Sequence, residues 1–123
     1  MNEVVKLLII YDSLTGNVQR FIEKLDMRSI KITPELFIDE PFVLITYTIG
    51  FGEVPKSIKR FLESNHRYLR GTIGSGNRNW GKFYCGAAET ISMQYDVPLL
   101  HKFELSGNVN DVEKIKQEVL NIV

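Results

Sequence analysis

The stretch VVKLLIIYDSLTGNVQRFIEKL, residues 4–25, decides the fold of this chain. Its first part, Val4 to Tyr11, is apolar and rich in β-branched side chains apart from Lys6, which is typical of a strand buried on both faces of a parallel sheet. Turn and helix-capping residues follow over 12–17. Apolar side chains then recur at helical spacing from Val18 to Leu25, so the stretch predicts a strand, a polar turn and an amphipathic helix.

The same unit recurs along the chain. The other predicted elements are a weaker strand over Ser29–Ile32, strands over Phe42–Tyr47, Tyr68–Ile73 and Pro98–Leu105, and helices from Pro55 onward, over Ala87–Tyr95 and over Val109–Val123. Strands that alternate with helices imply a parallel sheet with right-handed crossovers. We therefore predict an α/β fold, a flavodoxin-like three-layer sandwich with a five-stranded parallel sheet, as one domain over 1–123.

Bulk composition narrows the classes of function. Lys and Arg total 15, as do Asp and Glu, and this neutral balance argues against a nucleic-acid binder, which needs clustered positive charge. No apolar run approaches the roughly 20 residues that span a bilayer. The first six residues lack the basic head and cleavage site of a signal peptide. A single cysteine leaves no internal disulfide and no cysteine-based metal site. We expect a cytoplasmic protein.

The polar turn after the first strand has the chemistry of a phosphate site. Ser13 and Thr15 offer hydroxyls, Gly16 an unhindered backbone and Asn17 an amide, directly before a helix whose first N–H groups are unpaired. The loop contains no Lys or Arg, which a P-loop needs for a triphosphate, so a single terminal phosphate suits it better. Ser, Thr and Asn are also ordinary helix caps, and capping remains the alternative.

Two further turns carry unusual residues. Over 46–55, glycines flank Phe51, and the Gly50–Phe51 peptide could turn its carbonyl toward a ligand N–H such as a flavin N5. The alternative is a tight strand-to-helix connection. Over 74–81 lies Trp80, in a polar, glycine-rich loop where stacking on a planar ligand explains a large ring better than capping of the core does. Because ligands bind beyond the carboxyl ends of parallel strands, we expect the three turns to form one site.

These turns also carry a resemblance to a known family. The segment 13–17 resembles the flavodoxin phosphate loop. The stretches TGNVQRF, TYTIGFGEVP, GSGNRNWG, QYDVP and KFELSG, which begin at residues 15, 46, 74, 94 and 102, resemble the NrdI family, the small flavodoxin-like activators of class Ib ribonucleotide reductase. The match covers nearly the whole chain.

The resemblance implies a cofactor, a partner and a set of binding residues. The cofactor is flavin mononucleotide (FMN), reduced by a separate electron donor. The reduced protein reacts with oxygen to supply a superoxide-type oxidant for assembling the dimanganese-tyrosyl radical cofactor of the reductase. The first turn would hold the phosphate, the second would border the ring near N5, and the third would flank the ring. The candidate cofactor-binding residues are Ser13, Thr15, Gly16, Asn17, Val18, Thr48, Ile49, Gly50, Phe51, Gly52, Gly76, Asn77, Trp80 and Phe83.

Other functions are open on the residues alone. A general flavodoxin-type electron carrier and a non-redox module with a decayed flavin site both share the predicted fold. A phosphoacceptor receiver domain does not fit, because the second buried strand ends without an aspartate. We assign no catalytic side chain and no metal site, since the flavin would supply the chemistry. Cys85 is expected to be buried and inert, His66 to lie at the surface, and His101 to have no catalytic role.

Overall fold

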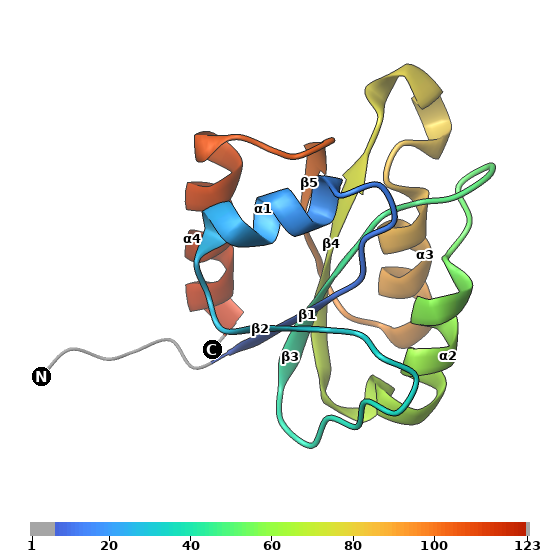
Figure 1. Cartoon of the computed structure of the whole chain (residues 1–123), viewed down its shortest axis with the longest axis vertical. Helices are drawn as coiled ribbons and strands as arrows, with labels where there is room; N and C mark the ends of the chain where they lie inside the picture. The colour runs from blue at the N-terminus through green and yellow to red at the C-terminus, as the bar shows by residue number, and fades with distance from the viewer. Residues whose placement is uncertain (1–6, 123) are drawn as a thin grey trace, which may run out of the picture.

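The computed structural model describes residues 7–122, which form a sheet covered by helices on both faces (Figure 1). All five strands pair in parallel, in the order β2-β1-β3-β4-β5. The strands are β1 (Leu8–Tyr11), β2 (Ser29–Lys31), β3 (Phe42–Thr46), β4 (Leu69–Gly76) and β5 (Leu99–Glu104). The α-helices are α1 (Asn17–Leu25), α2 (Lys56–Asn65), α3 (Gly86–Tyr95) and α4 (Val109–Ile122). This architecture confirms the predicted flavodoxin-like sandwich.

Two hydrophobic cores lie on opposite faces of the sheet. Ile9 of β1 packs with α1 and α4, whereas its neighbour Ile10 packs with α2 and α3. The side chains of both residues are fully buried. Successive side chains of a strand point to opposite faces, so a central parallel strand must be apolar throughout. Burying each such side chain contributes about 1.5–3 kcal/mol, which explains why the apolar runs dominate the sequence signal.

The strand order creates a crevice at one edge of the sheet. After β1 the chain crosses to α1 on one face, and after the adjacent β3 it crosses to α2 on the other (Figure 1). Where two neighbouring strands are followed by helices on opposite faces of the sheet, the loops after these strands diverge and leave a crevice. Ligands of open parallel sheets bind in this crevice, beyond the carboxyl ends of the strands. No helix within residues 7–122 is long and apolar enough to cross a membrane.

The predicted elements all form, with small shifts at their ends. β4 was predicted to end at Ile73 but continues to Gly76, because β5 pairs with it through Gly76 and Glu104. Gly74 belongs to the strand rather than to a turn. A Cβ at this position would lie 2.9 Å from the Cβ atoms of Cys85, the N-cap of α3, and of Ala88 within α3. The glycine permits close packing of helix on sheet. Residues 4–6 of the first predicted strand, and Val123 of the last helix, lie outside the described residues.

Two short 3-10 helices complete the chain, η1 (His66–Tyr68) and η2 (Arg78–Phe83). Neither was predicted. The η2 segment includes the second half of the tryptophan-containing turn, residues 78–81, and its backbone is kinked at Gly81, whose φ is 56°. A fixed helical turn therefore replaces the open loop expected after β4.

Candidate functional site

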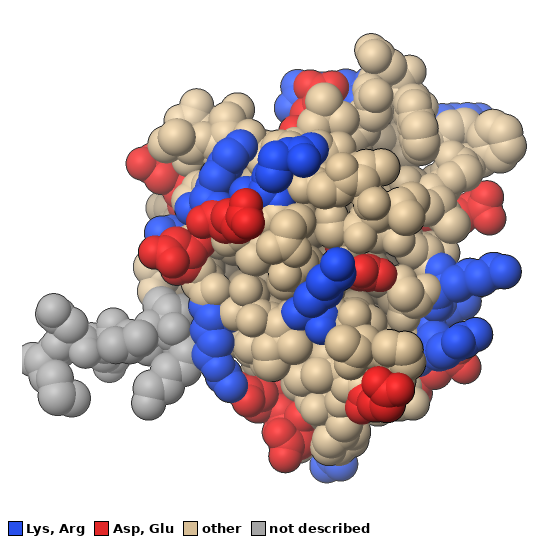
Figure 2. Space-filling view, viewed as in Figure 1, with Lys and Arg blue, Asp and Glu red and all other residues tan. Residues whose placement is uncertain are grey.

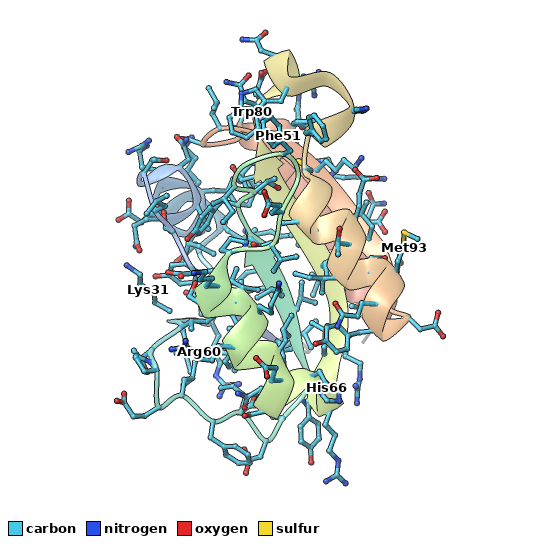
Figure 3. The ribbon with its side chains drawn as sticks, turned by 90° about the vertical axis from the view of Figure 1, so that its right-hand side faces the viewer. Lys31, Phe51, Arg60, His66, Trp80 and Met93 are labelled. Atoms are coloured by element: carbon cyan, nitrogen blue, oxygen red, sulfur yellow. The ribbon has the colours of Figure 1, made fainter. Side chains whose placement is uncertain are left out.

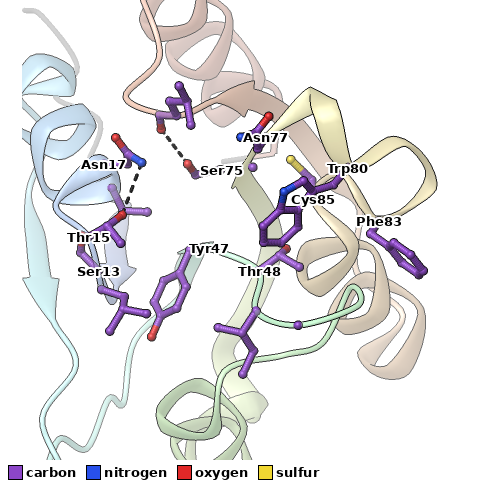
Figure 4. A pocket seen from close by; sticks show the side chains of 16 residues that line it. Ser13, Thr15, Asn17, Tyr47, Thr48, Ser75, Asn77, Trp80, Phe83 and Cys85 are labelled. Atoms are coloured by element: carbon purple, nitrogen blue, oxygen red, sulfur yellow. Dashed lines mark hydrogen bonds between the residues drawn. The ribbon is translucent and has the colours of Figure 1, made fainter.

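A cavity of about 430 Å³ lies beyond the carboxyl ends of β1, β3 and β4 (Figure 4). This volume falls within the range of small-molecule sites, about 300–1,000 Å³. All three of the turns predicted from the sequence contribute to it. Its lining residues are Ser13, Leu14, Thr15, Asn17, Val18, Tyr47, Thr48, Ile49, Gly50, Ser75, Gly76, Asn77, Trp80, Phe83, Cys85 and Leu105.

Every candidate cofactor-binding residue lines this cavity except Gly16, Phe51 and Gly52. Gly16 is the N-cap of α1, where its φ of 92° requires glycine. Phe51 is 79% exposed at the tip of the second turn. Gly52 packs against Phe83, since a Cβ on Gly52 would stand 3.2 Å from the Cδ1 atom of that ring. These three residues shape the turns rather than forming the wall of the cavity.

The first turn combines helix capping with unused donors. The Ser13 hydroxyl accepts the Gln19 N–H at 3.2 Å, so it caps α1, as the alternative interpretation held for this residue. Thr15 is placed differently, because its hydroxyl oxygen accepts from the Asn17 side-chain amide at 3.4 Å (Figure 4). A hydroxyl that accepts one hydrogen bond still has its own hydrogen to donate. Thr15 and Asn17 can therefore both donate to an anion at the start of α1.

A positive charge stands beside this turn although the turn itself contains none. The guanidinium of Arg20 donates to the Asn17 side-chain oxygen at 2.7 Å and to the Ser106 hydroxyl at 3.0 Å. Its Nη1 lies 2.8 Å from where a Cβ on Gly16 would stand. The loop itself contains no Lys or Arg, as the sequence showed, but a cation from the first turn of α1 stands next to it. The spacing of three residues between Asn17 and Arg20, which places side chains together on a helix, was the available signal.

The second turn is a tight hairpin. Ile49 and Glu53 exchange both backbone hydrogen bonds, at 3.1 and 2.8 Å. Gly50 and Gly52 between them have φ values of 53° and 89°, a region that favours glycine. The Thr48 hydroxyl accepts the Ala87 N–H at 3.0 Å, which ties the turn to the start of α3.

The third turn places an aromatic ring in the cavity wall. Trp80 is 45% exposed and belongs to neither core, so it does not cap the core. Asn77 begins the η2 helix: its side-chain oxygen accepts the Asn79 N–H at 2.9 Å, and its carbonyl accepts the Trp80 N–H at 3.0 Å. In Figure 4 the Trp80 indole projects into the cavity between Asn77 and Thr48. One face of the cavity is thus an aromatic plane held by a short helix.

Five lining residues were not among the candidates: Leu14, Tyr47, Ser75, Cys85 and Leu105. Two of them, Cys85 and Tyr47, shape the floor and the edge of the cavity. Cys85 is fully buried, as predicted, and burial raises the pKa of its thiol to about 11, so the sulfur is neutral. Tyr47 stands at the edge. Burial, and then the negative charge of Asp12, raise the pKa of the Tyr47 phenol, so this side chain is neutral as well. Tyr47 lies within the second predicted turn and Cys85 four residues beyond the third, and no polar signal in the sequence marks either as a ligand contact.

The histidines lie away from the cavity. His66 is exposed, as predicted, at the opposite end of the molecule from Phe51 and Trp80 (Figure 3). His101 is half-buried and pairs with Asp111 at 2.7 Å. No group of three or more metal-ligating side chains occurs within the described part of the chain. The cavity therefore offers hydrogen-bond donors at the first turn and an aromatic wall at the third, which fits a planar ligand that carries a phosphate.

Comparison with known proteins agrees with this chemistry. A family model described as NrdI flavodoxin-like matches residues 9–117. A relative from Bacillus licheniformis, described as Protein NrdI, is 56% identical over 116 residues, which cover 94% of this chain and 88% of that protein.

Solved structures share the fold. One is a short-chain flavodoxin associated with a non-canonical PDU bacterial microcompartment, with a TM-score of 0.67 at 16% identity over 94% of this chain and 95% of that one. Another is the two-electron reduced flavodoxin of Megasphaera elsdenii in solution, with a TM-score of 0.67 at 13% identity over 94% and 98% of the two chains. At such low identities these structures establish the fold alone.

Proposed function

The chain belongs to the NrdI flavodoxin-like family and is a flavodoxin-like flavoprotein, and from this premise we propose that it binds FMN and helps to activate a class Ib ribonucleotide reductase. The observation that carries the proposal is the shape of the cavity: phosphate-type donors at the start of α1 face an aromatic wall at Trp80 across a volume of about 430 Å³. FMN has one phosphate, which matches the donors at the first turn, and one planar ring system, which matches the aromatic wall at Trp80.

The first turn would hold the phosphate. Thr15 and Asn17 have hydrogens to donate, and the start of α1 adds a partial positive charge. The Ser13 hydroxyl oxygen already accepts the Gln19 N–H at the start of α1. The hydroxyl hydrogen of Ser13 remains available to donate to the phosphate. Val18 closes the cavity behind these donors.

The second and third turns would hold the ring. Thr48, Ile49 and Gly50 form one wall and Trp80 the other, with Asn77 and Phe83 beside it. Gly50 permits rotation of the peptide that follows it, so the carbonyl at this position can face a ring N–H or turn away. Gly76 and the neutral thiol of Cys85 keep the floor uncharged.

FMN held by these residues would supply the redox chemistry, the one-electron reduction of dioxygen to superoxide. The chain's own residues determine access to the site. Phe51 and Trp80 stand exposed at the same end of the molecule (Figure 3), so oxygen and a protein partner can reach this edge. We propose that the partner is the dimanganese subunit of the reductase, which uses the oxidant to generate its tyrosyl radical, and that a separate protein donates the electrons that reduce the flavin.

An anaerobic reductive titration of the purified protein tests the proposal. The reduced protein is then mixed with oxygen and the dimanganese subunit, and the tyrosyl radical is quantified by electron paramagnetic resonance. A flavin spectrum followed by radical formation supports the activator. A flavin that reduces and reoxidises without any radical in the partner indicates a general electron carrier. A colourless protein that takes up no FMN contradicts the proposal altogether.

A further inference from the structure

The side chain of Asn17 is held in one orientation by two donors. Its oxygen accepts hydrogen bonds from the Arg20 guanidinium at 2.7 Å and from the Ser106 hydroxyl at 2.8 Å. Arg20 also donates to that same hydroxyl at 3.0 Å, so the three side chains close a triangle. Because the oxygen side of the amide is occupied, the NH₂ group faces Thr15 and the cavity, where Figure 4 shows the contact. The triangle thus turns Asn17 into a donor.

The third member of the triangle comes from a distant part of the chain. Ser106 lies in the loop between β5 and α4, and Lys24 of α1 donates to two backbone carbonyls of that loop, of Ser106 at 3.1 Å and of Gly107 at 3.0 Å. Gly107 lies directly on α1, since a Cβ there would be 2.4 Å from the ring of Phe21. Figure 2 shows Lys and Arg side chains over α1 on this face, beside the loop.

The charge of Arg20 has no carboxylate partner within the described residues. The salt bridges found there join Arg28 to Glu40, His101 to Asp111, Lys102 to Glu89 and Lys114 to Glu118. Arg20 is exposed, and hydrogen bonds at an exposed site contribute little to stability. Orientation of Asn17 and supply of a positive charge are therefore the effects that the guanidinium can have, rather than stabilisation of the fold.

We propose that Arg20 is a positioning residue that makes the first turn selective for a phosphate monoester. The inference rests on the proposed FMN site and adds a determinant outside the turn itself. Arg20 holds the Asn17 amide so that its NH₂ group donates to the phosphate, and it places a positive charge behind the loop, where a dianion gains from it. A ligand with a free hydroxyl in place of the phosphate gains from neither effect.

The test compares FMN with riboflavin, which has the same ring system and lacks the phosphate. Apoproteins of wild type and of Arg20→Gln are titrated with each flavin, and the dissociation constants are taken from the change in flavin fluorescence. Arg20→Gln is expected to weaken FMN binding by about tenfold, the effect of losing one charge-assisted hydrogen bond, and to change riboflavin binding by less than about threefold. Arg20→Lys keeps the charge without the two-pronged donor and should fall between wild type and Arg20→Gln.

Lys24→Gln is the matched control. It removes a neighbouring cation of α1 that contacts the same loop but not Asn17, so the ratio of FMN to riboflavin affinity should stay within about threefold of wild type. Ionic strength is a second readout, because FMN affinity should fall with added salt in wild type and less steeply in Arg20→Gln.

Two results overturn the inference alone: Arg20→Gln retaining the wild-type affinity ratio, or weakening both flavins equally, which would indicate a merely structural role. A wild-type protein that binds neither flavin overturns the proposed function, and this inference with it.

Discussion

The Thr48 hydroxyl accepts a hydrogen bond from the Ala87 backbone N–H at 3.0 Å, and this contact joins the second turn to the start of α3. Cys85, the N-cap of α3, makes no side-chain capping bond. Thr48 therefore caps α3 from another segment of the chain, a role normally taken by the residue at the helix start itself.

Replacing Thr48 by Val removes this cap while keeping the shape of the side chain. We expect the free energy of unfolding to fall by about 1 kcal/mol, because one buried N–H loses its acceptor. FMN affinity should fall as well, since the second turn is no longer fixed to α3. Urea denaturation and flavin titration measure the two effects. Thr33→Val, at an exposed position away from the cavity, should change neither quantity.

The Trp80→Ala variant tests whether Trp80 serves ligand binding rather than stability of the fold. Because Trp80 belongs to neither core, its removal should leave the free energy of unfolding of the apoprotein unchanged within about 0.5 kcal/mol. FMN affinity should drop tenfold or more, about the contribution of a stacked aromatic ring and its buried area. Trp80→Phe keeps a ring and should retain most of the affinity. An unchanged affinity in Trp80→Ala would show that the ring does not stack on the ligand.

Gly74→Ala tests the packing of α3 against β4. A Cβ at this position would lie 2.9 Å from the Cβ atoms of Cys85 and Ala88, so the helix must move away from the sheet. We expect a loss of about 1–3 kcal/mol in the free energy of unfolding, the usual cost of overpacking a core. Gly81→Ala is the control. Its φ of 56° strains an alanine, but no atom stands within 4 Å of the new methyl group, so its loss reports backbone strain without overpacking and should leave the packing of α3 unchanged.

The thiol of Cys85 should be almost unreactive in the folded protein. With a pKa raised to about 11 by burial, its thiolate fraction at pH 8 is about a hundredfold below that of a thiol with the ordinary value of 9.0. Iodoacetamide labelling followed by mass spectrometry should therefore be slow until the protein is unfolded in urea. Rapid labelling of the folded chain at pH 8 would contradict the burial of this residue.

The same shift makes stability depend on alkaline pH. The folded state keeps the thiol protonated above the pH at which the unfolded chain loses the proton, so the contribution is complete below about pH 9 and disappears as pH rises toward 11. The raised pKa values of Tyr47, Tyr84 and Tyr95 act in the same direction. Cys85→Ser should therefore show a shallower loss of stability between pH 9 and 11 than wild type, measured by urea denaturation.

Phe51→Ala tests the proposed partner surface. Phe51 is 79% exposed and contacts Phe83 at a centroid distance of 5.7 Å, so its removal should leave stability and flavin content unchanged. Affinity for the dimanganese subunit should fall about tenfold or more if the ring is buried in the complex. Phe37 is similarly exposed, at 70%, on another loop, and Phe37→Ala should bind the subunit as wild type does. Unaltered affinity in Phe51→Ala would remove this residue from the interface.

The sequence predicted the sheet and its helices well because each apolar run had one consistent periodicity. The strand ending at Tyr11 and the helix from Asn17 form almost as expected. Gly74 was misleading, because a glycine that accommodates α3 and a glycine that makes a turn look alike in sequence. Contacts between segments that are distant in the sequence could not be predicted from the local sequence pattern either. Neither the pairing of Arg20 with Ser106 nor the capping of α3 by Thr48 follows from spacing along the chain.

The contact between Asn17 and Ser106 spans 89 residues, and it has a consequence for when the protein can acquire its cofactor during synthesis. The first turn leaves the ribosome early, but its amide acquires its second donor only when the loop beyond β5 has been made and has folded back onto α1. A nascent chain that stops before this loop has the turn without the partner that orients it. On the proposed function, capture of the cofactor's phosphate would wait for completion of nearly the whole chain, and a half-made protein would not hold a reactive redox group.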